Sequence, residues 1–515
     1  MENEKKDWLS KAVENAGSKE LTRRQLLKQI PKATGVLLGS ALVTPHLLKS
    51  MGVSFNAPNQ GKLLPAHPRT VKKLGHVDIR AENQKPGTTK WKITKPARPQ
   101  QLQGYASDFS VQPEGTITFF VHSTKPYRME IYRMGYYGGA GGRLMKVIDG
   151  IRPTKQNLTP DPHHFGAAWA PSQILRIPSD WPTGVYINKM TNVDGRESYI
   201  IFVVTETHPE ADFAVQIATN SYHAYDNWGG KSLYSYNSKG GKQAYQVSFN
   251  RPFRNYYGSG LFFQYEYNLI RWLEKEGYSL TYITDWDIHY DILERVNIKA
   301  LLIAGHAEYW TMKMRQSVEK LSATKFNLAN FSANVCYWQV RYHEDSTGRP
   351  GRLMVSYKQF AQEMDPYRVT NKTLTTTRWR DQPVNMPEDS LFGVMYTGIP
   401  KATVPMVVSD AKHWLYEGTG LKNGDKIPGV IGGEVDSYVR NLPGVEVIAK
   451  SPVILYGKKK LANVVWYNKP TGKKAFSVGT FYWNWFLDPI HHTVQAKENK
   501  HIQQITKNAL RELAK

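Results

Sequence analysis

Three short polar segments hold the residues best suited to chemistry. They cover residues 220–230, 305–310 and 332–338, and each follows an apolar run of the kind that forms a buried strand. The carboxyl ends of parallel strands meet at one edge of a sheet, which is where α/β proteins place their binding sites. The three segments are therefore expected to line one pocket.

His306 and Glu308 are the most promising pair within these segments. In extended backbone, residues two apart point to the same side, so both side chains can face one site. An imidazole and a carboxylate together can bind a metal ion or transfer a proton. The same spacing equally suits a structural arrangement, in which Glu308 caps a helix that begins near Thr311 and His306 is a buried histidine with satisfied hydrogen bonds. Spacing alone leaves both interpretations open.

Three other candidates favour structural roles. The glycine-rich segment 138–142 lacks the Gly-Lys-Ser/Thr sequence of a phosphate-binding loop, so a hairpin turn is expected there. Cys336 is the only cysteine, which excludes an intrachain disulfide, and it lacks the small neighbours of a nucleophile turn. A buried structural thiol is expected instead. Asp285 and Asp287 could hold a cation, although loop carboxylates that cap strand ends are commoner.

Two regions of different pattern surround these segments. Residues 77–206 contain short runs rich in β-branched and aromatic residues, separated by turn residues, which predicts an immunoglobulin-like β-sandwich domain. Residues 207–515 alternate strand-like and helix-like runs. This alternation predicts an α/β domain with a mostly parallel sheet and helices on its faces.

The amino-terminal region has the pattern of an export signal. Arg23 and Arg24 precede an apolar stretch, 30–48, which is too short and too weakly apolar for a permanent membrane span. Residues 1–50 are therefore predicted to be a twin-arginine signal region, and the Pro-, Lys- and Gly-rich residues 51–76 a linker. Export by the twin-arginine route would place the protein in the periplasm, outside the cell or at a membrane outside the cytoplasm. An amphipathic surface helix with an incidental Arg-Arg pair is the alternative.

Composition narrows the classes of partner. The 515-residue chain has a formal net charge of +23, which favours anionic surroundings such as an envelope polymer or lipid headgroups. Lys and Arg are spread along the whole chain without a five-residue basic run. Nucleic-acid binding is therefore not expected.

Several motifs resemble the large (beta) subunit family of N,N-dimethylformamidase. They are Ala224-Tyr225, 228–234 (WGGKSLY), Arg251-Pro252-Phe253, 305–310 (GHAEYW), 333–338 (ANVCYW) and 376–396. The segments 131–139 and 180–186 resemble the β-sandwich that accompanies many members of this family. The resemblance thus covers most of the chain from about residue 77 onward.

The resemblance implies a mononuclear iron site. In the characterised family enzyme, two tyrosines and a glutamate hold the iron, and a histidine and an asparagine lie nearby. Matched motif by motif, the metal ligands fall on Tyr225, Tyr234 and Glu308, and the catalytic residues on His306 and Asn334. Tyr234 is matched by counting from neighbouring motifs, and Tyr236 is the rival ligand. Two phenolates and a carboxylate form a hard oxygen set that suits ferric iron.

The resemblance also implies an activity. An exported iron-dependent hydrolase would act on an amide or a related C–N bond of a small-molecule substrate. The iron would act as a Lewis acid, His306 would shuttle a proton, and Asn334 would orient the substrate or stabilise the oxyanion. The family enzyme has a small separate subunit, which leaves a partner subunit or an oligomer open for this chain. Two other interpretations compete: a non-catalytic cell-envelope protein that binds an anionic polymer or saccharide, and a degenerate amidotransferase-like sheet that serves only as a scaffold.

Overall fold

The computed structural model describes residues 78–490 and 496–515. All described residues belong to one compact unit, Lys72–Lys515. The expected signal and linker, 1–76, lie outside the described residues, so the export signal stays a prediction. Among the helices of the described part, none combines the length and the apolar character that a membrane span needs.

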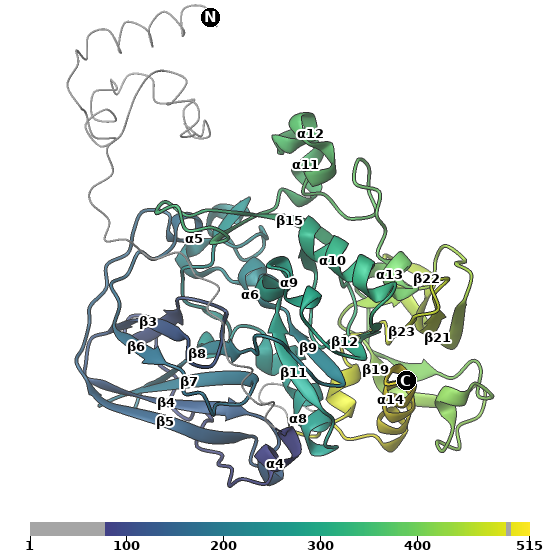
Figure 1. Ribbon diagram of the computed structural model, residues 1–515. Helices are drawn as coiled ribbons and strands as arrows, with labels where there is room; N and C mark the ends of the chain where they lie inside the picture. The colour runs from purple at the N-terminus through teal and green to yellow at the C-terminus, as the bar shows by residue number, and fades with distance from the viewer. Residues whose placement is uncertain (1–77, 491–495) are drawn as a thin grey trace, which may run out of the picture. The chain divides into compact units, whose positions relative to one another are not determined.

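The first part of this unit consists of two β-sheets, coloured purple to blue in Figure 1. One has the strand order β1-β3-β6 and the other β2-β8-β7-β4-β5, and every pair is antiparallel except β2 with β8. The strands are β1 Leu102–Ala106, β2 Ser110–Val111, β3 Thr116–Ser123, β4 Tyr127–Met134, β5 Gly142–Ile151, β6 Gln173–Arg176, β7 Gly184–Asn192 and β8 Glu197–Val204. The glycine-rich segment 138–142 joins β4 to β5 as the expected hairpin turn.

These two sheets share one hydrophobic core. Buried residues alternate along β3, which is the pattern of a strand with one face turned inward. Phe119 of β3 packs in the same cluster as Met129 and Phe202 of the other sheet. The sheets therefore face each other across a common core, while the immunoglobulin type of their topology stays a prediction.

The second part of the unit contains the sheet that positions the candidate site, at the centre of Figure 1. Its order is β11-β9-β12-β14-β23-β22-β21; the first five strands are parallel and the last two antiparallel. The strands are β9 Phe213–Ile217, β11 Leu280–Thr284, β12 Ala300–Ile303, β14 Asn327–Asn330, β21 Val445–Leu455, β22 Lys458–Asn468 and β23 Lys474–Ser477. The mostly parallel sheet is confirmed; the likeness to amidotransferases and the domain boundary at residue 206 stay predictions.

Smaller sheets and helices complete the unit. A four-stranded sheet has the order β10-β16-β15-β13, and two pairs are β17 with β20 and β18 with β19. These strands are β10 Gln246–Ser248, β13 Tyr309–Thr311, β15 Trp338–His343, β16 Leu353–Val355, β17 Met395–Gly398, β18 Val404–Val407, β19 Lys426–Ile431 and β20 Val435–Ser437. The α-helices are α4 Ile79–Asn83, α5 Pro162–Phe165, α6 Thr219–Tyr225, α7 Phe262–Tyr265, α8 Tyr267–Lys275, α9 Asp285–His289, α10 Met312–Ser322, α11 Ala361–Met364, α12 Tyr367–Thr370, α13 Asp389–Phe392 and α14 Lys500–Leu513.

Local side chains explain where helices begin and break. Asp287 forms a capping box with Thr284 at the start of α9, so this carboxylate has a structural role. A single helix is expected from Leu261 onward by periodicity, but the structure has two, α7 and α8, with a break at Glu266. The Glu266 carboxylate turns inward and accepts a hydrogen bond from the Ala218 amide at 3.4 Å, which favours the break.

The five-stranded sheet also packs against the α/β part. Tyr132 of β4 and Val185 of β7 belong to the same hydrophobic cluster as Leu273 of α8. Arg133 and Glu274 form an ion pair of 2.7 Å between β4 and α8, and both side chains are completely buried. The two parts of the unit are thus joined by a continuous core and a buried charge pair.

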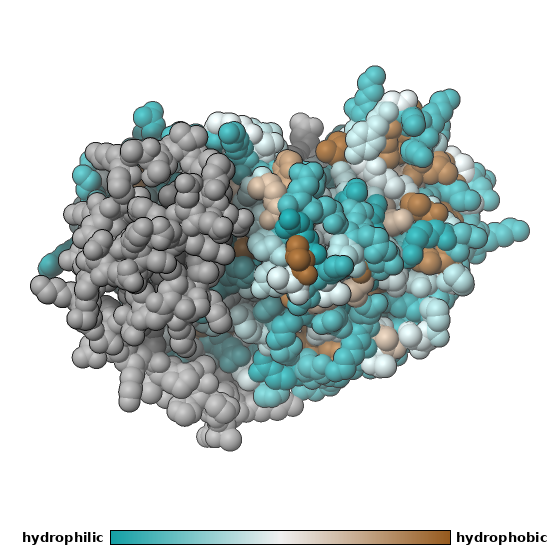
Figure 2. Space-filling view, turned by 90° about the horizontal axis from the view of Figure 1, so that it is seen from above, coloured by the Kyte–Doolittle hydropathy of each residue, from teal (hydrophilic) through white to brown (hydrophobic). Residues whose placement is uncertain are grey.

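The surface seen from above is mainly hydrophilic. On its coloured part, Figure 2 shows teal side chains over most of the face, with brown apolar residues scattered between them. Scattered apolar residues are normal on soluble proteins and do not indicate an interface by themselves. The coloured part of this view therefore gives no reason to expect an apolar docking surface there.

His289 is expected to make folding stability depend on pH. Its Nδ1 lies 2.7 Å from Thr311 Oγ1, and burial lowers the pKa of the imidazole to about 4. The unfolded chain, with a histidine pKa of about 6.5, then binds more protons than the folded chain between these values. Stability is complete above pH 6.5 and is lost as the pH falls towards 4, by at most about 3 kcal/mol for this residue.

Urea denaturation at pH 7 and pH 4.5 measures this contribution. The free energy of unfolding of His289→Asn is expected to fall by about 2 kcal/mol less than that of the wild type over this interval. His208, which is exposed, supplies the control variant His208→Asn. Equal losses in wild type and His289→Asn would contradict the prediction.

Candidate functional site

The three polar segments come together at the carboxyl edge of the parallel sheet, as expected. Tyr225 is the last residue of α6, which follows β9; Glu308 lies between β12 and β13; and Asn334 follows β14. Backbone hydrogen bonds join the last two loops, because the amide groups of Tyr337 and Trp338 donate to the Glu308 carbonyl oxygen at 2.9 and 3.0 Å. Neighbouring strands thus place their loops around one point.

The two expected tyrosine ligands meet the expected glutamate. The Tyr225 hydroxyl donates to Glu308 Oε2 at 2.7 Å. Tyr234 Oη lies 2.8 Å from Tyr225 Oη and 3.0 and 3.1 Å from the two Glu308 oxygens. Tyr236 has no such contact among the described residues: its side chain is 74% exposed and its ring centre lies 5.7 Å from that of Tyr234. The geometry therefore favours Tyr234 over Tyr236 as the second phenol.

His306 and Asn334 border the same cluster together with a third acidic residue. His306 Nε2 lies 3.3 Å from Glu308 Oε2 and 3.5 Å from Glu434 Oε2. The Asn334 side chain hydrogen-bonds both carboxyl groups. Sequence reasoning missed Glu434; the signal was an acidic residue that follows two glycines just after the strand β19.

The structural interpretation of Glu308 as a helix cap is wrong. Thr311 itself caps α10, because its hydroxyl accepts the amide hydrogen of Met314 at 3.2 Å. Glu308 is 2% exposed, and its carboxylate faces the two tyrosines instead. A buried carboxylate that does not cap a helix needs other partners, and here these are hydroxyl groups.

Burial and repulsion between neighbouring acidic groups shift the pKa values of this cluster. The pKa of Glu308 is raised by burial, and that of Glu434 is raised well above its usual range by burial and by the charge of Glu308. Burial and the same carboxylate raise the pKa values of Tyr225 and Tyr234 well above the ordinary tyrosine value. Burial lowers the pKa of His306 to about 3. All four acidic groups thus resist ionisation in this small volume, and a cation among them would reverse that preference.

The donor set fits a hard metal cation such as ferric iron. Two phenol oxygens and a carboxylate converge to within 3.1 Å of one another, and hard oxygen donors of this kind suit ferric iron. His306 Nε2, Asn334 Oδ1 and Glu434 Oε2 are buried at its border without a good hydrogen bond of their own. No group of three His, Cys, Asp or Glu side chains in the described residues could hold a metal ion, so binding would depend on the phenols.

A buried lysine stands behind the two tyrosines. Lys358 Nζ lies 3.1 Å from the centre of the Tyr234 ring and 3.5 Å from Tyr309 Oη. The Tyr309 hydroxyl in turn donates to Tyr234 Oη at 2.5 Å. Burial lowers the pKa of Lys358 to about 7, against the opposing effect of Glu308. No motif marks Lys358 in the sequence, because only the fold brings it to Tyr234.

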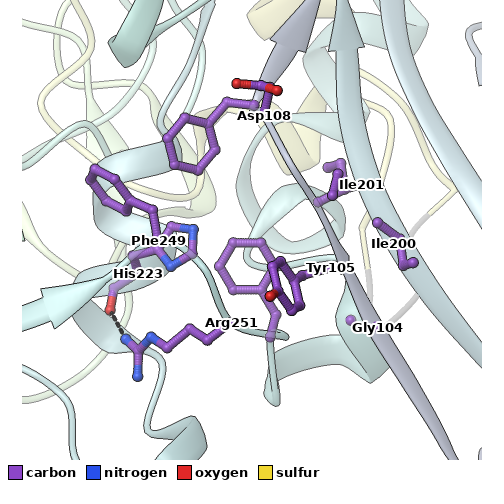
Figure 3. A pocket seen from close by; sticks show the side chains of 12 residues that line it. Gly104, Tyr105, Asp108, Ile200, Ile201, His223, Phe249 and Arg251 are labelled. Atoms are coloured by element: carbon purple, nitrogen blue, oxygen red, sulfur yellow. Dashed lines mark hydrogen bonds between the residues drawn. The ribbon is translucent and has the colours of Figure 1, made fainter. Parts of the chain in front are cut away.

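Arg251 holds the loop that carries Tyr225. Its guanidinium donates to the carbonyl oxygens of His223 at 2.8 Å, Trp228 at 2.7 Å and Asp226 at 3.1 Å. Figure 3 shows the first of these bonds beside a small cavity of about 20 Å³, room for little more than one water. The Arg-Pro-Phe motif therefore has a positioning role, and the cavity is too small for a substrate.

Cys336 lies near this site but takes no part in it. Its thiol is completely buried, at 3.6 Å from Arg315 Nη1, and burial raises its pKa to about 12. The thiolate needed for nucleophilic attack is therefore not accessible near neutral pH. The expectation of a buried structural thiol is confirmed.

The cluster opens into a large cavity. Its volume is about 680 Å³, and Tyr225, His306 and Glu434 form part of its wall. The rest of the lining combines aromatic and amide side chains, including Tyr265, Phe481 and Gln264. This cavity is large enough for a substrate of drug-like size, with the polar cluster at its edge.

Comparisons with known proteins bear on this site. A family model described as N,N-dimethylformamidase beta subunit-like, C-terminal, matches residues 128–499. No curated protein matches the chain. A solved structure described as mmIFT52 N-terminal domain is similar at 9% identity and a TM-score of 0.26, with 46% of this chain and 86% of that chain covered. So low a TM-score carries no argument, whereas the family match spans every strand that supports the candidate site.

Proposed function

Because the chain belongs to the N,N-dimethylformamidase beta subunit-like family, we propose that it is an iron-dependent hydrolase of an amide or related C–N bond. The observation that carries the proposal is the convergence of the Tyr225 and Tyr234 hydroxyls on Glu308. Family membership by itself supports only an amidase-like role. The donor set adds the metal, because two phenols and a carboxylate have no evident structural use at a cavity wall.

Tyr225, Tyr234 and Glu308 would hold the iron. Bound there, a ferric ion supplies a Lewis acid that polarises an amide carbonyl and favours ionisation of water at neutral pH. The tyrosines would lose their protons on metal binding, because the positive charge outweighs the burial that raises their pKa values. Lys358, beside the Tyr234 ring, adds a further positive charge that stabilises the phenolate.

Proton transfer would use His306 and Glu434. His306 Nε2 lies between the carboxylates of Glu308 and Glu434, so a proton can pass along this row of atoms. Burial and the charge of Glu308 raise the pKa of Glu434 well above its usual range, so its carboxyl group would hold a proton that it can pass on. Asn334 bonds both carboxyl groups, and its amide would orient the substrate or stabilise the oxyanion.

The cavity volume argues for a substrate larger than dimethylformamide. A space of about 680 Å³ would leave so small an amide poorly enclosed, since good ligand sites bury most of the ligand surface. We also propose export by the twin-arginine route, on the basis of Arg23, Arg24 and the apolar stretch 30–48 that follows them. That route would allow an iron site to be assembled before export. A partner subunit, an oligomer and an anionic envelope surface remain proposals of the same kind.

Iron analysis and visible spectroscopy test the proposed function. Protein purified from iron-replete cells is expected to contain about one iron per chain and to show the visible charge-transfer band of tyrosinate bound to ferric iron. Removal of iron by a chelator should abolish both the band and amide hydrolysis. Colourless, metal-free protein would contradict the proposal and favour a non-catalytic envelope protein.

A further inference from the structure

Among the described residues, Arg254 is the only lysine or arginine that lines the large cavity. Its side chain is exposed, and it forms no ion pair or hydrogen bond to the residues that the structure describes. The neighbouring Asn255 amide also lines the cavity and has no side-chain hydrogen bond within the described part. The side chains of Arg254 and Asn255 are therefore available to a ligand. The amide side chains of Asn227, Asn237 and Gln264, which also line the cavity, already form hydrogen bonds.

The loop that carries Arg254 is held in an unusual conformation. Tyr256 and Tyr257 have φ values of 44° and 60°, a region that residues other than glycine rarely adopt and that costs about 1–3 kcal/mol each. Such strain persists only where surrounding contacts hold it, and it concentrates at ligand sites. The strained pair follows Arg254 and Asn255 directly, so it helps to set where these side chains lie.

Three hydrogen bonds hold the loop that carries Arg254. The Arg254 amide donates to Asp226 Oδ1 at 2.6 Å, and Ser198 Oγ of β8 donates to the Tyr257 carbonyl oxygen at 3.0 Å. The Tyr256 hydroxyl donates to Gln264 Oε1 at 2.5 Å. Strand β8 of the β-sheet part thus supports the wall of the cavity, and the backbone of Arg254 is held in place by a hydrogen bond.

One acidic and one basic side chain, Glu434 and Arg254, both line the cavity. Glu308 and Glu434 lie at the candidate iron site and offer no positive charge to an anionic group of a substrate. Arg254 offers the opposite charge in the same cavity, and arginine binds carboxylates through two parallel hydrogen bonds. The overall charge of +23 would also draw anions towards the protein.

We propose, on the basis of the proposed function, that the substrate is an N-acyl compound that also has a carboxylate. Its amide would lie at the tyrosine–glutamate cluster, and Arg254 would bind its carboxylate. The size of the cavity allows both groups in one molecule. Arg254 then selects anionic amides over neutral ones of equal size. It contributes to binding and specificity and takes no part in bond cleavage.

Isothermal titration calorimetry with two matched probes tests this inference. The probes are N-benzoylglycine and its neutral N-methylamide, each titrated into the wild type, Arg254→Gln and Arg254→Lys. Wild type is expected to bind the carboxylate about tenfold more tightly, since an exposed charge-assisted pair is screened by water. Arg254→Gln should lose this preference, Arg254→Lys should keep part of it, and added salt should weaken it.

Arg152 provides the matched control, because it is an exposed arginine outside the cavity lining. Arg152→Gln removes the same net charge and should keep the preference. A preference that survives in Arg254→Gln, equal affinities in wild type, or no binding of either probe would overturn the inference. Benzoate and phenyl phosphate, titrated in parallel, show whether the site prefers a carboxylate or a phosphate, and a phosphate preference would overturn the carboxylate assignment.

Iron content, measured on the same samples, separates this inference from the proposed function. Iron-containing protein that hydrolyses amides without a carboxylate preference would refute the role of Arg254 alone. Iron-free protein that still prefers N-benzoylglycine in an Arg254-dependent manner would refute the proposed function and leave the anion site in place.

Discussion

Tyr225→Phe is expected to abolish stoichiometric iron binding and to lower the kcat/KM of amide hydrolysis by about a thousandfold, or roughly 4 kcal/mol of transition-state stabilisation. The substitution removes one oxygen, which lies 2.7 Å from Glu308 and 2.8 Å from the Tyr234 oxygen. Phe keeps the ring and its packing, so the folded state should persist. Iron content per chain, the visible band and thermal unfolding of the metal-free protein are the measurements.

Tyr236→Phe is the matched control for the metal site. Tyr236 lines the cavity but is 74% exposed and lies apart from the oxygen cluster. Its substitution should leave iron content and the visible band unchanged, whereas Tyr234→Phe should behave as Tyr225→Phe does. If Tyr236→Phe lost iron and Tyr234→Phe retained it, the assignment of the second phenol would be wrong. Full iron content in Tyr225→Phe would refute the proposed ligand set.

Glu274→Gln is expected to lower the free energy of unfolding by about 3–5 kcal/mol. Glu274 accepts hydrogen bonds from Arg133 Nη2 at 2.7 Å, the Tyr282 hydroxyl at 2.6 Å and the Asn83 amide at 2.9 Å. A glutamine cannot neutralise the completely buried Arg133 guanidinium, so a charge would stay uncompensated in the core. Urea denaturation of the metal-free protein at pH 7 measures the loss.

Asp194→Asn provides the exposed counterpart. Lys125 and Asp194 form an ion pair of 2.8 Å whose side chains are 49% and 43% exposed, and its removal should cost less than about 1 kcal/mol. The double variant Arg133→Met/Glu274→Leu should be more stable than Glu274→Gln, because neither buried charge remains. A loss below 1 kcal/mol in Glu274→Gln would show that water or relaxation compensates Arg133.

Local pattern was sufficient to predict many elements of the fold. Alternation of apolar residues predicted β3, since a strand with one buried face must repeat every two residues. A helix was predicted to begin near Thr311, and α10 begins there, because the Thr311 hydroxyl satisfies a free amide group of its first turn. The break at Glu266 could not be predicted this way, because the apolar periodicity that begins at Leu261 continues through it.

The sequence by itself determined that three polar loops each follow a strand of a parallel sheet. Local periodicity shows where strands, helices and loops succeed one another along the chain. It also carried the motifs that match Tyr225, Glu308 and the family. The motif match placed the second phenol on Tyr234 and left Tyr236 as its rival. The tertiary structure favours Tyr234, because its hydroxyl reaches Glu308 while the Tyr236 side chain is exposed.

The tertiary structure alone also decided which distant residues complete the site. Glu434 and Lys358 come from loops far along the chain, and no periodicity connects them with Tyr234 or His306. The two interpretations of Glu308 were likewise separated by contact, because a carboxylate that faces two phenols cannot cap a helix at the same time. Charge–charge interactions and hydrogen bonds depend on distances in space, and for residues far apart in the sequence only the folded chain fixes these distances.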